Sequence, residues 1–477
     1  MTKYEVVIGL EVHAELSTNT KIYCNCTTDF GADPNTHCCP ICTGMPGTLP
    51  VLNEKVVEYA VKAGLATNCE IAKFSKQDRK NYFYPDLPKA FQTSQYDLPL
   101  CEHGYLDVNI STGKKRIGIT RIHIEEDAGK LIHDAYTGDT LVDMNRCAVP
   151  LIEIVSEPDL SGAEDAIAYM QNLKSILEYL EVCDCKMQEG SLRCDVNLSV
   201  RPVGQKEFGT RTETKNLNSF KAIQRSIEYE TKRQIEEIEA GGIIYQETRR
   251  FDDTKGIGYA MRTKEDAHDY RYFPEPDLAP IVLSKEYIKN IKDNLPEMPH
   301  VRKERYIKEY KLSEYDAEQL TNSKNVAQFF EDCVAICKNP KTVANWLMSD
   351  FAKMLNEAEI DITKSKVTPD ILAGLVVLID KKTISSAIAK KVFPDMFETG
   401  ERAESIVEKK GLVQISDEGQ ITAIVKKIID NNPQSVSDYR AGKDKAIGFL
   451  VGQIMKETRG KANPQIVNSL LIDALKD

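Results

Sequence analysis

Apolar and polar residues alternate over residues 4–15, which read YEVVIGLEVHAE. A period of two is typical of a β-strand with one buried face. Side chains two positions apart share a face, so Glu11 and His13 project opposite the main apolar row. A carboxylate beside an imidazole suits a divalent cation or a proton-transfer site, although a solvated strand face has the same pattern.

Two later segments, residues 191–200 and 210–215, also read as strands with one polar face. The first, SLRCDVNLSV, has an apolar row at its even positions from 192 to 200. The polar rows are Arg193, Asp195 and Asn197 in the first segment, and Arg211, Glu213 and Lys215 in the second.

Residues 116–130, RIGITRIHIEEDAGK, begin as a strand and end in an acidic pair. The apolar phase changes between Ile119 and Ile122, which predicts a bulge or a strand buried on both sides. If strand geometry continues, Glu125 and Glu126 fall on opposite faces, so we expect one of them to reach any site on the polar face.

Strands with one apolar and one polar face are typical of an antiparallel sheet that is packed on one side. If the polar faces converge, they provide ligands for one or two magnesium ions: Glu11, His13, one of Glu125 and Glu126, Asp195 and Glu213. The basic residues on these faces would offset the charge of a bound phosphate: Arg193, Arg211 and Lys215. An ordinary charged sheet surface is the alternative, but such surfaces usually mix signs without clustering carboxylates.

Residues 78–95, DRKNYFYPDLPKAFQTSQ, contain two prolines and four aromatic residues and are not expected to form a regular element. An irregular loop that is both aromatic and basic is suited to a phosphate or a nucleotide. Lys80 and Tyr82 are therefore its candidate nucleotide contacts, although a packed surface loop would look similar.

The remaining pattern is mainly helical. Helices are expected at 54–66, from Ser219 to Gly241, and at 302–311, 326–338 and 342–357. The predicted fold class is α+β. It comprises a mainly antiparallel sheet domain at residues 1–294, a helical domain at 295–402 and a small helical tail at 403–477.

Five cysteines follow the first strand in the frame YCNC…HCCPIC. Cys-x-Cys and Cys-x-x-Cys pairs at this separation predict a tetrahedral, structural zinc knuckle. Its expected ligands are Cys24, Cys26, Cys39 and Cys42, with Cys38 as a neighbour that could compete for the fourth position. A cluster of reduced, buried thiols is the alternative.

Composition narrows the class of protein. The most apolar run, residues 371–379, is too short to span a bilayer, and we expect a cytoplasmic protein without membrane contact. The net charge of −11 argues against a protein that coats nucleic acid, but residues 440–461 carry a net charge of +4 and could contact RNA.

The sequence contains no P-loop, so any ATP is bound in another way.

Taken together, the motifs resemble the B-subunit family of the tRNA-dependent amidotransferase. The resemblance extends over nearly the whole chain and rests on IGLEVH (8–13), CPIC-GMPG (39–47), LPVLN (49–53), RKNYFYPDLPKAFQ-SQ (79–95), EEDAGK (125–130), PLIEIVSEPD (150–159), EGSLRCDVN (189–197), TKNLNSF (214–220), ETRRFD (247–252), DYRYFPEPD (269–277) and GFLVGQIMK (448–456).

This resemblance implies ATP- and Mg²⁺-dependent phosphorylation of the side-chain carboxylate of mischarged Glu-tRNA(Gln), Asp-tRNA(Asn) or both. Ammonia from an A subunit, which is the amidase (glutaminase), would then displace the phosphate, in a complex that also contains a small C subunit. It also implies a tail that recognises the tRNA. The catalytic residues would include Glu11, His13, Glu125, Glu126 and Arg193. The implied magnesium ligands are Glu11, His13, Glu126, Asp195 and Glu213, with Glu125 as the substitute for Glu126. The implied nucleotide contacts are Lys80, Tyr82, Arg193, Arg211 and Lys215.

Two other classes of function remain at this point. One is a zinc-stabilised tRNA-binding scaffold whose catalysis lies in its partners. The other is a metal-dependent phosphohydrolase that acts alone. The polar sheet faces favour the amidotransferase function, because a scaffold does not need them.

Overall fold

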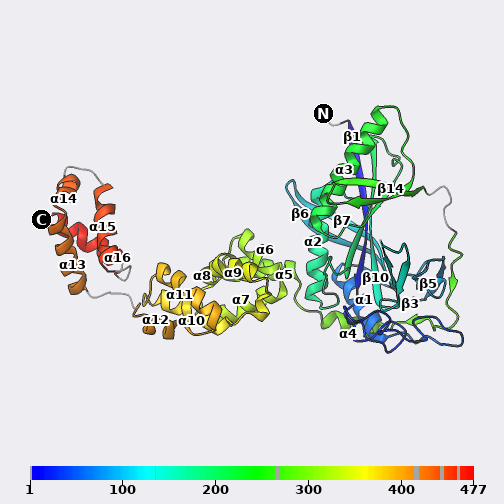
Figure 1. Cartoon of the computed structure of the whole chain (residues 1–477), viewed down its shortest axis with the longest axis horizontal. Coiled ribbons are helices and arrows are strands. Elements are labelled where there is room, and N and C mark those ends of the chain that lie inside the picture. The colour runs from blue at the N-terminus through cyan, green and yellow to red at the C-terminus, as the bar shows by residue number, and fades with distance from the viewer. Residues whose placement is uncertain are drawn as a thin grey trace. The chain divides into compact units, whose positions relative to one another are not determined.

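The computed structural model describes residues 3–134, 136–263, 269–412, 418–440, 445–458, 462 and 464–476. The chain divides into two compact units, residues 1–298 and 299–477 (Figure 1). Among the described residues, no helix is both long enough and apolar enough to cross a membrane.

The first unit contains all the described strands. They are β1 (Tyr4–Glu15), β2 (Glu70–Ile71), β3 (Phe74–Ser75), β4 (Asp78–Asn81), β5 (Phe91–Ser94), β6 (Cys101–Ile110), β7 (Gly113–Glu126), β8 (Lys130–His133), β9 (Thr140–Asp143), β10 (Pro150–Ser156), β11 (Leu192–Pro202), β12 (Thr212–Lys215), β13 (Glu247–Asp252), β14 (Ile257–Thr263), β15 (Phe273–Pro274) and β16 (Ile281–Val282). Its helices are α1 (Glu54–Ala66), α2 (Ala163–Tyr179), α3 (Phe220–Glu239) and α4 (Lys285–Asp293).

The main sheet has nine strands in the order β14-β13-β12-β11-β1-β10-β7-β6-β2, with β1 at its centre. Neighbouring strands in it are antiparallel except for β12 and β13, which run parallel. The expected α+β class with a mainly antiparallel sheet is therefore confirmed, whereas the parallel pair was not predicted. Strands β12 and β13 lie far enough apart in the chain for α3 to connect them, as a parallel pair requires.

One face of this sheet is packed. Ile8, Leu10 and Val12 of β1 are almost completely buried and share a core with residues of α1, α2 and α3. These three helices lie along the sheet in Figure 1. Because β1 alternates, its odd-numbered residues, including Glu11 and His13, point to the opposite face.

The helix and bulge predictions agree with the structure in several places. Helix α1 has the predicted bounds and begins where the Asn53 side chain accepts a hydrogen bond from the Lys55 backbone. Ser219 caps α3 in the same way, through the backbone N–H of Ala222. The register between β7 and β10 shifts next to Ile119, which confirms the bulge.

Two predictions of local structure were wrong. Residues 78–95 are not irregular throughout, because they begin as β4 and end as β5, an antiparallel pair. The two prolines lie in the connection between these strands, where they cost no ladder hydrogen bonds. The helix expected at 342–357 is broken at Ser349, whose backbone has φ −118° and ψ −100°, into α8 (Pro340–Met348) and α9 (Asp350–Ala358).

The described part of the second unit is helical. Its elements are α5 (Pro299–Tyr310), α6 (Glu314–Thr321), α7 (Lys324–Cys337), α8, α9, η1 (Ile362–Lys364), α10 (Pro369–Asp380), α11 (Ser386–Thr399), α12 (Ala403–Lys409), α13 (Glu418–Asn431), α14 (Pro433–Arg440), α15 (Lys445–Glu457) and α16 (Pro464–Lys476). Helices α5 to α12 enclose one core, and α13 to α16 enclose another. Helix α12 lies within the predicted tail, but its Ala403, Ile406 and Val407 pack into the core of the preceding helices.

Candidate functional site

The candidate site lies on the open face of the main sheet, where polar residues from five adjacent strands meet. Strand β1 positions them, because it pairs with β11 on one side and with β10 on the other. Glu11 lies opposite Asp195, and His13 lies opposite Glu153. Two groups of ligand-bearing side chains result, one on each side of β1.

The first group consists of Glu11, Asp195 and Glu213, one residue from each of β1, β11 and β12. One carboxylate oxygen from each lies within 4.8 Å of the others. The Lys215 ammonium bridges two of them, 2.5 Å from Asp195 Oδ2 and 3.0 Å from Glu213 Oε1. Burial, followed by the charges of nearby carboxylates, raises the pKa of Glu11. The group therefore holds more negative charge than Lys215 neutralises, as expected of a cation site.

The second group consists of His13, Glu125 and Glu153, from β1, β7 and β10. His13 Nε2 lies 3.4 Å from Glu153 Oε2 and 3.8 Å from Glu125 Oε1. Burial alone would lower the pKa of His13, but the hydrogen bond and charge of Glu153 outweigh it and raise the pKa to about 9. The second histidine of this neighbourhood is His123, whose Nε2 lies 3.5 Å from both carboxylates.

Glu153 is the residue of this group that was not predicted from the sequence. A local signal was present, because Glu153 is the single charged residue of the mainly apolar strand β10. Glu153 lies opposite His13 because β10 pairs with β1. The pattern of apolar and polar residues does not show which strands pair, so this contact could not be predicted.

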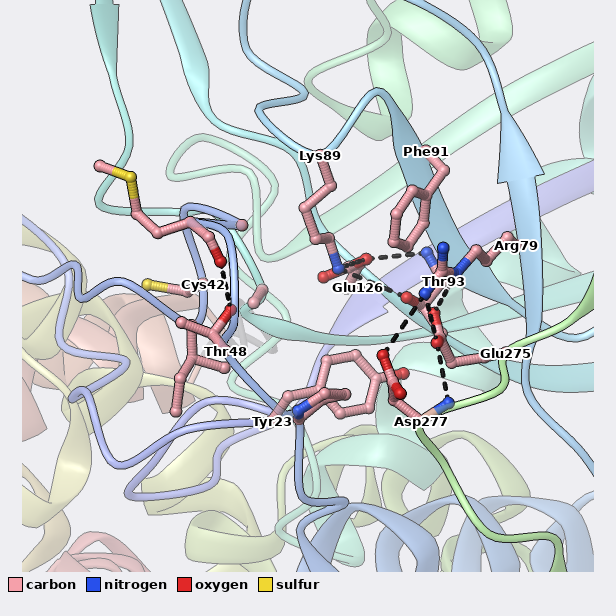
Figure 2. A pocket seen from close by; sticks show the side chains of 15 residues that line it. Tyr23, Cys42, Thr48, Arg79, Lys89, Phe91, Thr93, Glu126, Glu275 and Asp277 are labelled. Carbon is pink, nitrogen blue, oxygen red and sulfur yellow. Dashed lines mark hydrogen bonds and ion pairs between the residues drawn. The ribbon is translucent and has the colours of Figure 1, made fainter.

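Glu125 and Glu126 lie on opposite faces, as parity predicted, but Glu125 is the one that reaches His13. Glu126 instead accepts a hydrogen bond of 2.7 Å from the backbone N–H of Thr93 and forms an ion pair with Lys89. Both of these partners lie in a separate pocket, shown in Figure 2 with Tyr23 on its wall. The grouping of Glu126 with His13 that the family resemblance implied is therefore not seen.

The Figure 2 pocket has a volume of about 170 Å³ and several charged side chains in its wall. Arg79 Nε lies 2.6 Å from Glu275 Oε2, and the Arg79 guanidinium carbon lies 4.3 Å from the centre of the Phe91 ring. The pocket joins the β4–β5 pair to the segment at 273–277, since Phe273 pairs with Arg79. It is thus a polar chamber distinct from the two acidic groups.

The expected nucleotide contacts lie in three places. Lys80 is 5.0 Å from the centre of the Tyr270 ring and 5.9 Å from that of Tyr82. Burial opposes its charge, but the carboxylates of Glu125 and Glu153 outweigh this and raise the pKa of Lys80. Lys80 and Tyr82 therefore lie beside the second group, while Lys215 belongs to the first.

Arg211 is exposed and lines a cavity of about 260 Å³ next to Glu11. The cavity continues along β1 past Gly9 and Val7, and Phe208 forms part of its wall. It is therefore directly continuous with the first acidic group.

Arg193 differs from Lys215 in its partner, because its guanidinium pairs with Asp127, a carboxylate outside the two acidic groups. Nη2 lies 2.6 Å from Asp127 Oδ2, and Arg146 approaches the same carboxylate at 3.6 Å. Burial opposes ionisation, but these two arginines lower the pKa of Asp127 to about 2. The charge of Arg193 is thus already balanced within the fold.

The cysteines expected to bind zinc are brought together. Sulfur atoms of Cys24, Cys26, Cys39 and Cys42 all lie within 4.8 Å of one another, and Cys38 is outside the group. The Lys21 side chain is completely buried beside Cys42. Its ammonium donates to the carbonyl oxygen of His37 at 2.7 Å and lies 3.8 Å from Cys42 Sγ.

A hydrogen bond from Cys24 lowers the pKa of Cys42 to about 5 against the effect of burial, and the charge of Lys21 acts in the same direction. Four sulfur donors fit a closed zinc site, and the buried cation beside them would offset part of their negative charge. A closed site would leave no position for a substrate, so the role of bound zinc would be structural.

Comparison with known proteins gives the same family along most of the chain. Residues 6–289 match the GatB/GatE catalytic domain family, and residues 328–475 match the GatB domain family. The chain is 63% identical over 477 residues to the aspartyl/glutamyl-tRNA(Asn/Gln) amidotransferase B subunit of Caldicellulosiruptor bescii, covering 99% of both chains. It is 62% identical to the protein of the same name from Caldanaerobacter subterraneus subsp. tengcongensis, with 99% of both covered, and 56% identical to that of Geotalea daltonii, with 99% of this chain and 100% of the relative covered. The chain therefore belongs to the family of B subunits of the aspartyl/glutamyl-tRNA(Asn/Gln) amidotransferase.

Proposed function

We propose that this chain activates and amidates the amino acid of mischarged Glu-tRNA(Gln), Asp-tRNA(Asn) or both. The γ-phosphoryl group of ATP passes to the side-chain carboxylate, which gives an acyl phosphate and ADP. Ammonia then attacks the acyl carbon and phosphate leaves, so that Gln-tRNA(Gln) or Asn-tRNA(Asn) is formed. Phosphorylation is needed because a carboxylate is a poor electrophile and has no good leaving group.

The observation that carries this proposal is the pair of acidic groups on either side of β1. Carboxylate oxygens are the ligands that Mg²⁺ prefers, and the donor sets fit two such ions. Magnesium bound there would supply charge neutralisation for the phosphates and the acceptor carboxylate. We assign Glu11, Asp195 and Glu213 to one ion, and His13, Glu125 and Glu153 to the other.

The basic residues beside the two acidic groups suggest which part of the substrates binds at each group. Lys215, Arg211 and the cavity beside Glu11 would hold the nucleotide, with Phe208 and Val7 available to its base. Lys80, beside Glu125, would face the acceptor carboxylate and the transferred phosphoryl group. Each charged group of the substrates would then meet a cation as it enters the site.

Ammonia would be supplied from glutamine by an A subunit, the amidase (glutaminase), and a small C subunit would complete a heterotrimer in the cytoplasm. The name shared by the relatives, that of a B subunit, supports such an assembly. The family is that of a ligase-type, glutamine-dependent complex acting in protein biosynthesis.

The second candidate function is a tRNA-binding scaffold that the zinc knuckle stabilises. The buried Lys21 favours bound zinc, because its positive charge lies beside the Cys42 sulfur and no carboxylate pairs with it among the described residues. A scaffold does not explain why carboxylates from five strands converge on the open face. The enzyme is therefore the better account of the sheet.

Substitution of Glu11 or His13 separates these two functions. In the assembled complex, Glu11→Ala and His13→Ala should abolish ATP cleavage that depends on Glu-tRNA. The affinity for tRNA should stay within about twofold, because the basic tail is unchanged. Full transamidation by either variant would overturn the assignment of the acidic groups.

A further inference from the structure

A row of four tyrosines extends from the second acidic group to the protein surface, and the proposed function gives these tyrosines no role. We call it the tyrosine row: Tyr82, Tyr270, Tyr272 and Tyr96. Successive ring centres are 6.1, 6.0 and 4.3 Å apart. The first two contacts are edge-to-face, and the last is a parallel stack with an interplanar angle of 9°.

The inner end of the row lies at the site. Lys80 is within cation–π range of both Tyr82 and Tyr270. The charge of Glu125 contributes to raising the pKa of Tyr82 and of Tyr272, after the larger effect of burial. The rings are thus close neighbours of the carboxylates that we assign to the acceptor side.

The outer end of the row is exposed but rigidly held. Tyr96 is 54% exposed, while its backbone N–H donates to Asp78 Oδ2 at 3.0 Å. Its two preceding residues are tied to β7, since Ser94 Oγ donates to Glu125 Oε2 at 3.3 Å and Gln95 Oε1 accepts from the Ile124 backbone at 2.9 Å. Arg121 lies alongside, with Nη1 3.3 Å from the Tyr96 carbonyl oxygen.

A fixed, half-exposed tyrosine stack next to a cation is the usual composition of a surface that binds unpaired nucleotides. The aminoacyl-tRNA proposed above as the substrate carries an unpaired nucleotide beside its reacting group. The amino acid is esterified to this nucleotide, the terminal adenosine of the tRNA. An adenine stacked on the outer end of the row would direct the esterified amino acid along the rings toward Glu125 and Lys80.

We propose that Tyr96, supported by Tyr272, stacks with the terminal adenine of the aminoacyl-tRNA and so positions the acceptor carboxylate. This inference rests on the proposed function. Tyr96 would act as a positioning residue, since it contacts the base rather than the reacting atoms. The row supplies no hydrogen-bond code, so it would hold the end of either tRNA.

The test is a double-mutant cycle between Tyr96 and the terminal adenosine in the complete complex with its partner proteins. Binding of intact tRNA and of tRNA lacking only the terminal adenosine is measured for the wild type, Tyr96→Ala and Tyr96→Phe. Tyr245→Ala is the matched control, because Tyr245 is another exposed tyrosine of the same unit.

We expect Tyr96→Ala to weaken binding of intact tRNA by about 5- to 150-fold, the range for one base–aromatic stack, and to leave the truncated tRNA nearly unaffected. Tyr96→Phe keeps the ring and should bind as the wild type does, as should Tyr245→Ala. The KM for ATP should not change. Equal weakening of both tRNAs, or no weakening of either, would overturn the proposal, and so would loss of a partner protein from the Tyr96→Ala complex. These outcomes leave the dependence of ATP cleavage on Glu11 and His13 intact, so they are distinct from a failure of the proposed function.

Discussion

Glu125 and Glu126 are adjacent in β7, yet their carboxylates belong to different sites. Glu125 Oε1 lies 3.8 Å from His13 Nε2, whereas Glu126 accepts a 2.7 Å hydrogen bond from the Thr93 backbone in the Figure 2 pocket. Both residues are 2% exposed, so burial does not distinguish them. The two side chains are separated only because successive residues of a strand point to opposite faces of the sheet. The role of each residue can therefore be tested separately.

The first prediction compares Glu125→Gln with Glu126→Gln, which are matched in size and differ only in the face that they alter. Loss of the Glu125 charge should reduce Glu-tRNA-dependent ATP cleavage by more than about 100-fold, because Glu125 is a proposed direct ligand of the metal. Glu126→Gln should keep this cleavage within a few-fold of the wild type. Measurement of ADP release by both variants checks the assignment, and a reversed order of activities would return the metal to Glu126.

The second prediction concerns pH. In the metal-free protein the pKa of His13 is about 9, so the imidazole is protonated at pH 7 and a divalent cation must displace this proton. Apparent affinity of the second group for Mn²⁺ should therefore rise about tenfold per pH unit from pH 6 to 8 and level off above pH 9. Calorimetry in two buffers of different ionisation enthalpy should detect the released proton. A His13→Gln variant should lose the slope, and an unchanged slope would mean that another group titrates.

The third prediction concerns zinc and the buried Lys21. Lys21→Met keeps the aliphatic stem but removes the charge beside Cys42, and should lower zinc affinity by about 10- to 100-fold in a chelator competition. Lys73→Met is the control, because Lys73 is an exposed lysine of the same unit. If purified protein held no zinc and its four thiols titrated freely, the knuckle itself would be excluded.

The fourth prediction concerns the tail. Since α12 packs with the preceding helices, a clean deletion removes residues 413–477 and leaves that core intact. The truncated protein should bind tRNA more weakly, with a shallower dependence of affinity on salt, because phosphate contacts are lost. Its first unit should melt at an unchanged temperature. Unaltered tRNA affinity would refute a role of the tail in recognition.

The sequence pattern predicted which face each polar residue occupies, but not which strands are neighbours. Parity is a local property, and it correctly separated Glu11 and His13 from the core and Glu125 from Glu126. Pairing is a long-range property, so Glu153 was missed and the parallel β12–β13 contact was not predicted. The cysteine group could be predicted because its members lie close together in the chain. The assignments of metal and nucleotide to these residues stay predictions.

The most direct test of the two-ion site is the anomalous diffraction of crystals of the complex soaked with Mn²⁺ and a non-hydrolysable ATP analogue. We predict two manganese peaks, one among Glu11, Asp195 and Glu213, and one among His13, Glu125 and Glu153. The phosphates should lie between the peaks and Lys215. Manganese bound only at Glu126, or phosphates bound elsewhere on the protein, would contradict the site.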